Sequence, residues 1–338
     1  MKIYTIRDVA QEAGVSVTTV SRVLNGRPDV SRETRERVHA IIAAHNFVGN
    51  ANARSLKQQD EIVAALILRG RSNPFLSGLG EAMIHYAAES PVSMLLEAID
   101  EKADEYQTAL RLMHEKRAKG FVFLGSRLDE RADALRSAEV PVVFATVDAT
   151  QAGFTNCSSV FIDERAMGYQ AVETLLQAGH RRIAVFGGDR TVGDGLAARF
   201  QGAKDAFDDA GIPFDESRYV DTRFSLSGAY DAARAFFSLH ADTTAVFAMS
   251  DIVAMGVIRA LKDLGRRVPE DVSVVGFDGI EMGKYFIPSL TTVAQPADEI
   301  ARKSVEALLD MMLEGGDGRQ IKLDAKLVTR ESVKPPKK

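Results

Sequence analysis

Cysteine is nearly absent from this sequence, which has Cys157 alone among 338 residues. A single cysteine excludes a disulfide framework and any Cys-x-x-Cys metal site. The six histidines show neither a His-Glu-x-x-His arrangement nor another spacing typical of metal ligands. We therefore expect neither a bound metal nor a cofactor.

Long hydrophobic runs are also lacking. No stretch of 18 consecutive apolar residues occurs, so the sequence predicts no transmembrane helix. The first residues, MKIYTIRDVAQEAG, bring Arg7, Asp8 and Glu12 into the part that a signal peptide would keep apolar. These two absences predict a cytoplasmic protein.

Positive charge is in deficit over most of the chain but not at its beginning. Residues 1–59 contain nine Lys/Arg and five Asp/Glu, a net charge of +4, whereas the remaining residues have a net charge of −9. A basic end on an acidic body is typical of proteins that contact nucleic acid through that end.

Residues 1–48 have the pattern of three short helices. Thr5, Ser16 and Ser31 are candidate N-caps of the three, and Gly14 suits the left-handed position that ends the first. Apolar residues repeat at helical spacing within each segment, which indicates one buried face per helix. A helix, a tight glycine turn and a second helix predict a helix-turn-helix domain.

The outward face of the second helix is unusual for a helix that only fills a core. It carries Val17, Thr18, Ser21, Arg22 and Asn25. Apolar groups suit thymine methyls, hydroxyls suit phosphates or base edges, and arginine suits guanine. A solvated face of a small domain is the alternative interpretation. The residue types favour a helix that lies in the major groove of DNA.

Residues 49–59 lack a core-forming stripe and have the composition of a linker. Beyond Asp60 the pattern alternates between strand-sized apolar runs and helical segments. Near-continuous apolar strands that alternate with helices predict doubly wound parallel sheets, and the number of units suffices for two sheets. The runs are Ile62–Leu68, Val92–Leu96, Phe121–Leu124, Val140–Ala145, Ile183–Phe186, Ala245–Ala248 and Val272–Val275.

Polar and aromatic residues that follow these strands are candidates for a ligand site, because ligands of such sheets bind at the carboxyl ends of the strands. Carboxylates and arginine can hold sugar hydroxyls, and aromatic faces stack on the sugar ring. For Asp251 and Asp278, helix capping is the alternative role. The candidates are Asn73, Phe75, Arg199, Phe224, Asp251 and Asp278.

Motifs of enzymes are missing. The glycine-rich GGDRTVGDG has neither the Gly-x-Gly-x-x-Gly pattern nor a Walker lysine, and no Gly-x-Ser-x-Gly elbow occurs. An α/β body of this kind is compatible with three classes of protein: a DNA-binding regulator controlled by a ligand, a sugar-binding protein of a transporter, and an α/β enzyme. The transporter protein would have a signal peptide and no helix-turn-helix. The sequence favours the regulator.

Ten segments, in order, resemble the LacI/GalR family of bacterial transcription regulators. At the beginning these are TIRDVAQEAGVSVTTVSRVLNG, VSRETRERV and NFVGNANARSL. Further on they are SNPFLSGL, VFIDERAMGYQAV, GHRRIAVFGG, ARFQGAKDAF, AVFAMSD, VPEDVSVVGFDG and PSLTTVAQP. The resemblance covers the chain except for its last residues.

The resemblance implies roles in DNA binding. Val17, Thr18 and Arg22 match base-reading positions, and Leu56 matches a leucine that inserts between base steps from the minor groove, with Ala53 beside it. Gly49 stands where the family has proline before the hinge asparagine, Asn50, so we expect the hinge over 49–59 to be harder to order. Further DNA-binding candidates are Thr5, Ser16, Ser21, Asn25, Ser31 and Thr34.

For the body, residues 60–338, the resemblance implies a periplasmic-binding-protein-like effector domain of two subdomains. We expect these to span about 61–161 with 291–324 and 162–290 with 325–338. Asp163, Arg199 and Asp278 match effector-contact positions. The expected function is a repressor that binds a palindromic operator as a homodimer, associates with the nucleoid when bound, and responds to a small sugar-like effector. The SVKPPKK ending, without a leucine heptad, predicts a dimer and not a tetramer.

Overall fold

The computed structural model describes residues 4–24, 27, 29–45, 62–190 and 195–337. The chain divides into two compact units, Met1–Glu61 and Ile62–Lys338.

The described residues of the first unit form three helices, α1 (Ile6–Ala13), α2 (Val17–Leu24) and α3 (Arg32–Ala44). Thr5 makes a complete capping box with Asp8 at the start of α1, and Gly14 has a φ of 66° at its end. Val9, Ala10, Ala13, Val20, Val23 and Val38 form the small core. The helix-turn-helix prediction is confirmed.

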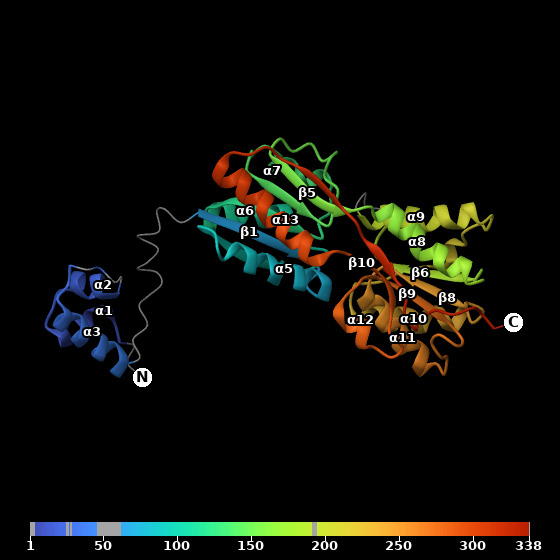
Figure 1. Cartoon of the computed structure of the whole chain (residues 1–338). Coiled ribbons are helices and arrows are strands. Elements are labelled where there is room, and N and C mark those ends of the chain that lie inside the picture. The colour runs from blue at the N-terminus through green and yellow to red at the C-terminus, as the bar shows by residue number, and fades with distance from the viewer. Residues whose placement is uncertain (1–3, 25–26, 28, 46–61, 191–194, 338) are drawn as a thin grey trace. The chain divides into compact units, whose positions relative to one another are not determined.

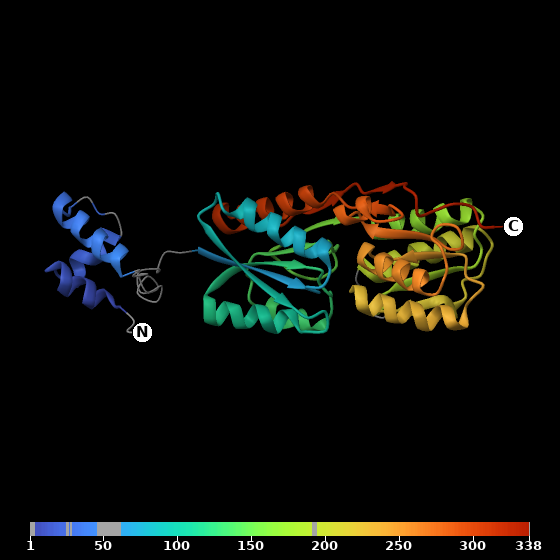
Figure 2. The same cartoon turned by 90° about the horizontal axis from the view of Figure 1, so that it is seen from below.

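Two parallel sheets make up the second unit, and both have helices on each face (Figures 1 and 2). The first sheet has the strand order β11-β5-β4-β3-β1-β2. All its neighbouring strands run parallel. Its strands are β1 (Ile62–Arg69), β2 (Val92–Ile99), β3 (Ala118–Leu124), β4 (Val142–Ala145), β5 (Cys157–Ile162) and β11 (Gln320–Leu323).

Each sheet with the helices packed on it forms one lobe of the second unit, and the first sheet belongs to the first lobe. Side chains that alternate between the two faces of its strands divide this lobe into two cores. In β1, Ala64 and Leu66 face α5 (Pro74–Ala87) and α13 (Ala297–Leu309). Ala65 and Ile67 face α6 (Glu105–Lys116) and the short α7 (Asp133–Arg136). Because successive side chains of a strand point to opposite faces, an unbroken apolar strand supplies both cores.

The second sheet has the order β12-β10-β9-β8-β6-β7. Its strands are β6 (Ile183–Gly187), β7 (Tyr219–Asp221), β8 (Ala245–Ala248), β9 (Ser273–Asp278), β10 (Thr291–Ala294) and β12 (Lys326–Val328). Only β12 runs antiparallel to its neighbour, β10. Helices α8 (Glu164–Gln177) and α9 (Gly195–Asp209) pack on one face. Helices α10 (Leu226–Leu239) and α11 (Asp251–Asp263) pack on the other, and the short α12 (Glu281–Tyr285) follows β9.

The chain passes between the two lobes three times: after β5, after β10 and between β11 and β12. The expected subdomain boundary between residues 290 and 291 needs correction, because β10 (Thr291–Ala294) pairs with β9 in the second sheet. The passage therefore comes after Ala294. Short strands such as β10, which the apolar runs did not indicate, caused this error.

The described part of the chain contains no helix with the length and apolar character needed to cross a membrane. Among the same residues, no group of three or more His, Cys, Asp or Glu side chains is arranged to hold a metal ion.

Candidate functional site

The outward face of α2 is exposed, as the sequence predicted. Val20 and Val23 are buried, whereas Val17 is 41% exposed and Thr18 and Arg22 are exposed. Nη1 of Arg22 lies 3.4 Å from Oδ2 of Asp29, in an ion pair whose two side chains are both more than half exposed. An exposed pair of this kind is weak, so Asp29 does not hold the guanidinium firmly in place.

Serines and threonines around this face have local partners. The Ser16 hydroxyl accepts a hydrogen bond from the backbone N–H of Thr19 at 3.1 Å, and Ser31 accepts one from Thr34 at 3.3 Å. Such caps fix the ends of the helices. Ser21 is half-buried on α2. Asn25, Asn50, Ala53 and Leu56 lie outside the described residues.

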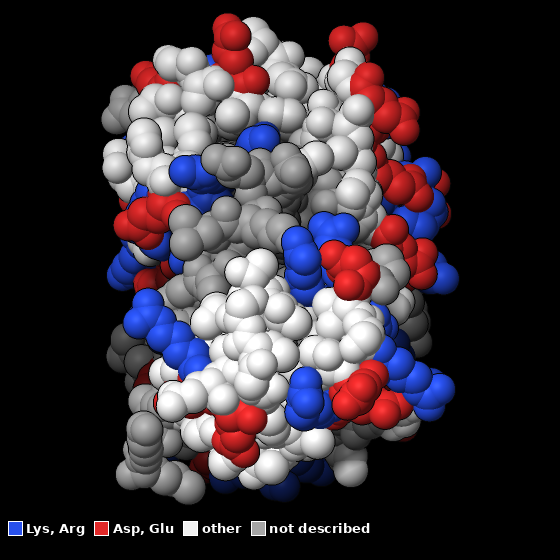
Figure 3. All heavy atoms as spheres, turned by 90° about the vertical axis from the view of Figure 1, so that its left-hand side faces the viewer, with Lys and Arg blue, Asp and Glu red and all other residues white. Residues whose placement is uncertain are grey.

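On the face shown in Figure 3, charge alone does not mark a DNA-binding area. Basic and acidic side chains of the described residues are interspersed there around uncharged surface, without a large area of one sign. The case for DNA binding therefore depends on the particular side chains of α2 and on the helix-turn-helix geometry.

The second unit contains a cavity of about 610 Å³ between the two sheets, at the carboxyl ends of their strands. Five sequence-predicted residues line it: Asn73, Phe75, Arg199, Phe224 and Asp278. Asn73 also caps α5 by accepting a hydrogen bond from the N–H of Phe75 at 3.0 Å. The cavity therefore lies where ligands of parallel α/β sheets bind, at the carboxyl ends of the strands.

Arg199 is held rigidly at the base of the cavity. Its Nε donates to Oε2 of Glu164 at 2.7 Å and its Nη2 to Oε1 at 3.0 Å, so the pair is bidentate. Nη1 donates to the carbonyl of Met249, and the guanidinium carbon lies 3.4 Å from the ring centre of Phe277. Because both side chains are less than a tenth exposed, the fork is fixed in place before any ligand arrives.

Asp278, the last residue of β9, is buried and has a φ of 112°. This left-handed backbone is strained for a residue other than glycine and is found most often at functional sites. Its carboxylate accepts hydrogen bonds from Oγ of Ser250 at 2.8 Å and Nε2 of Gln295 at 3.0 Å. Burial raises the pKa of Asp278 to about 6, against the opposing effect of the Arg199 charge.

Asp251 and Asp163 are not among the residues that line the cavity, which corrects their placement at the ligand. Asp251 is fully buried and accepts hydrogen bonds from the N–H groups of Gly279 and Ile280, both at 2.8 Å. It therefore fixes the turn that follows Asp278. Asp163 caps α8 through Ala166 and pairs with Lys322 of β11 at 2.7 Å, so its carboxylate has structural partners.

Several lining residues were missed by the sequence reasoning. They share one position, just after a strand or at its last residue, and the rule that selected Asp278 could have selected them too. Their charged members are Arg69, Glu101, Lys102, Arg127, Asp189, Asp221 and Arg223, together with Glu164 at the start of α8. Arg223 joins the two lobes: its Nε donates to Oε1 of Glu101 and its Nη2 to Oδ2 of Asp100, both at 2.6 Å.

Two family descriptions match the chain. Residues 5–50 match "Bacterial regulatory proteins, lacI family", and residues 172–333 match "Periplasmic binding protein-like domain". The regulator MalR of Clostridium butyricum is 35% identical over 330 residues, which cover 97% of this chain and 98% of that protein. The ribose operon repressor of Haemophilus influenzae is 30% identical, with coverages of 97% and 98%.

Comparison with solved structures also finds transcriptional regulators. A complex of the transcriptional regulator CelR with cellobiose is 29% identical with a TM-score of 0.71, and covers 98% of this chain and 100% of that one. The lac repressor dimer bound to operator and the anti-inducer ONPF is 27% identical, with a TM-score of 0.70 and coverages of 98% and 99%. The chain belongs to the lacI family of bacterial regulatory proteins and is a DNA-binding transcriptional regulator, not an enzyme.

Proposed function

We propose that this regulator is a repressor that binds a palindromic operator as a homodimer and is controlled by a small sugar-like effector in the cavity between the two sheets. The observation that carries the proposal is the cavity itself. A strained aspartate and a fixed arginine fork lie there together, at the carboxyl ends of two parallel sheets. Relatives whose structures contain cellobiose or ribose support a sugar-like ligand.

We assign base reading to Val17, Thr18 and Arg22, and insertion into the minor groove to Leu56. Residues 49–59 connect the two units in the sequence. When it is bound to its operator, the protein would be located at the nucleoid. Effector contacts are assigned to five lining residues, Asn73, Phe75, Arg199, Phe224 and Asp278. A dimer suits a palindrome because the spacing of half-sites follows the symmetry of the protein.

Operator binding is tested with Arg22→Ala on a set of operator variants. The loss of a base-reading arginine costs about 1–3 kcal/mol and relaxes the preference at one symmetric base pair. The matched control is Arg37→Ala, which removes an exposed arginine from α3. A uniform loss of affinity across all variants by Arg22→Ala would contradict base reading. Sedimentation at micromolar protein checks the dimer.

Effector control is tested by thermal shift against a panel of sugars and sugar derivatives, followed by operator binding with each stabilising compound. A ligand that binds the folded state alone raises stability by RT ln(1 + [L]/Kd). We expect Asp278→Asn to abolish the thermal shift and the change in operator affinity, while operator affinity without effector is retained. The exposed Asp317→Asn is the control. Wild-type behaviour of Asp278→Asn would remove this residue from the site.

A further inference from the structure

The two walls of the effector cavity have opposite charge. Three ion pairs first remove charges from the balance: Arg199 with Glu164, Arg223 with Glu101, and Arg69 with Glu105. What is left on the wall of the first lobe is basic, namely Lys102 and Arg127. The wall of the second lobe carries the acidic Asp221 and Asp278. The cavity therefore has a positively charged wall on the first lobe and a negatively charged wall on the second.

Lys102 and Arg127 differ from the other cations of the cavity because neither pairs with a carboxylate among the described residues. Nε of Arg127 is buried and has no hydrogen-bond partner. Arg69, by contrast, donates from Nε to the carbonyl of Gly125 at 2.8 Å and from Nη1 to the carbonyl of Glu101 at 2.6 Å. A buried donor without an acceptor is costly, so an acceptor at this place would be bound favourably.

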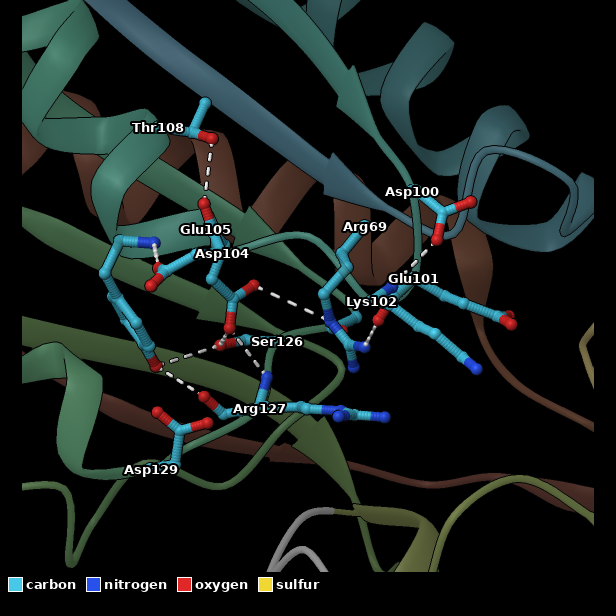
Figure 4. A network of polar contacts seen from close by, with 12 residues as sticks. Arg69, Asp100, Glu101, Lys102, Asp104, Glu105, Thr108, Ser126, Arg127 and Asp129 are labelled. Carbon is cyan, nitrogen blue, oxygen red and sulfur yellow. Dashed lines mark hydrogen bonds and ion pairs between the residues drawn. The ribbon is translucent and has the colours of Figure 1, made fainter.

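Carboxylates near the two cations are engaged elsewhere (Figure 4). Oε1 of Glu105 accepts hydrogen bonds from Oγ of Ser126 and from the backbone N–H of Arg127, both at 2.8 Å, and so holds the main chain and not the guanidinium. Asp104 caps α6, and Asp129 pairs with Arg131. In the view of Figure 4, the side chains of Lys102 and Arg127 extend away from this network toward the same side.

The acidic wall lies within electrostatic range of the basic one. Burial and the charge of Asp189 raise the pKa of Asp221, while Lys102 and Arg127 act on it in the opposite direction. No ion pair between Asp221 and either cation is present in the described structure. A ligand between the walls would thus have cations on one side and hydroxyl acceptors on the other.

We propose that the effector is a hydroxylated anion, a sugar acid or a sugar phosphate, with its anionic group against Lys102 and Arg127 and its hydroxyls toward Asp221 and Asp278. The inference rests on the proposed effector function of this cavity and specifies its ligand. Carboxylate and phosphate share the chemistry that the two cations recognise, since both accept charge-assisted hydrogen bonds. The opposed walls would also fix the orientation of such a ligand in the cavity.

The experiment measures calorimetric affinities of the full chain for matched sets of probes. Each set contains a neutral sugar, its uronic or aldonic acid and its terminal phosphate, with glucose, galactose, ribose and cellobiose as parents. The variants are Lys102→Gln, Arg127→Gln and the double variant. The control is Lys119→Gln, because Lys119 is exposed near the amino-terminal end of β3, away from the cavity.

We expect at least one anionic probe to bind about tenfold or more tightly than its neutral parent, which is the order expected for a hydrogen bond between charged groups. The double variant should bring the two within about threefold of each other, and Lys119→Gln should not. Tighter binding of the acid would identify the anionic group of the effector as a carboxylate, and tighter binding of the phosphate would identify it as a phosphate.

Three results would overturn the inference. If neutral sugars bind as tightly as their anions, the effector function stands and the charge assignment fails. If the double variant weakens neutral and anionic probes equally, Lys102 and Arg127 act in cleft closure and not on a ligand anion. If no probe binds, the proposed sugar-like effector fails, and this inference fails with it.

Discussion

At the scale of single residues, Arg199 has a structural role as well as its proposed contact with the effector. Its bidentate pair with Glu164 is buried, and removing one member of such a pair leaves an uncompensated charge. The loss of effector response in an Arg199 variant would therefore not separate binding from folding. Asp278 is the better position for a binding test, because Asp278→Asn leaves this ion pair intact.

We predict that Arg199→Met lowers the free energy of unfolding by about 3–5 kcal/mol. The double variant Arg199→Met/Glu164→Gln should recover most of this loss, because the remaining buried group is then neutral. Urea denaturation measures both. Arg165→Met is the control, since its pair with Asp205 is largely exposed on the arginine side and should contribute little. Equal stability of the single and double variants would contradict the role given to Glu164.

Glu105 gives a prediction for pH. Burial raises its pKa to about 7, although Arg69 opposes the shift, and its Oε2 has no hydrogen-bond partner. Because the folded pKa exceeds that of the unfolded chain, the folded state binds this proton more tightly. The contribution to stability is complete below about pH 4.5 and is lost as the pH rises through about 7.

Glu105→Gln mimics the protonated carboxyl and should remove this dependence. Relative to the variant, wild type is expected to lose up to about 3 kcal/mol of unfolding free energy between pH 4.5 and pH 7.5. Urea denaturation at pH 4.5, 6 and 7.5 tests the prediction. A difference between the two proteins that stays constant across this range would show that Glu105 is ionised throughout.

At the scale of elements, two glycines allow α8 and α9 to pack closely. A Cβ at Gly202 would lie 1.8 Å from the carbonyl oxygen of Arg165, and one at Gly168 would lie 2.0 Å from that of Arg199. Neither contact is possible without separating the helices. Since α9 carries Arg199, the spacing of the two helices also sets the position of the cavity's arginine fork.

Gly202→Ala is therefore expected to cost about 1–3 kcal/mol of stability and to weaken effector binding. Gly78→Ala is the matched control, because a Cβ there meets nothing within 4 Å in the middle of α5. That substitution should stabilise the protein by up to about 1 kcal/mol. Thermal and urea unfolding of the two variants compare them directly. A neutral Gly202→Ala would mean that the helices can separate at no cost.

The sequence predicted those elements whose burial produces a clear local pattern of apolar residues. Long apolar strands such as β1 and β9 were found because both of their faces are buried. Helical segments were predicted between the strands, but α10 and α13 were not placed individually, although Ala229, Phe236 and Ile300 are buried in them. Strands β10, β11 and β12 are three or four residues long, and β11 and β12 pair with strands that lie far away in the sequence. Local patterns do not contain that information.

The site was predictable to a similar degree. Position after a strand selected Asn73, Arg199 and Asp278, all of which line the cavity. The same criterion selected Asp251, whose carboxylate instead binds the N–H groups of the next turn. Capping and ligand binding use the same residue type at the same location, so only the direction of the side chain separates them.

At the scale of the whole second unit, Arg223 connects the lobes at the mouth of the cavity through Asp100 and Glu101. We predict that Arg223→Ala shifts the population toward a more open cleft. Spin labels at Lys116→Cys and Lys262→Cys, in a Cys157→Ser background, would report longer distances between the lobes. Arg234→Ala, an exposed arginine within the second lobe, is the control. An unchanged distance distribution would mean that the chain connections alone hold the cleft.

The three passages of the chain between the lobes also affect how the protein is made. Helix α13 and strand β11 come near the end of the chain, yet Ile300, Ala301, Val305 and Leu308 of α13 belong to the same core as Ala64 and Leu66 of β1. On the ribosome, the first lobe must therefore wait for more than a hundred later residues before this core can close. A nascent chain stopped within the second lobe would expose the apolar face that α13 covers, and such fragments should be recognised by chaperones and proteases and not persist as folded single lobes.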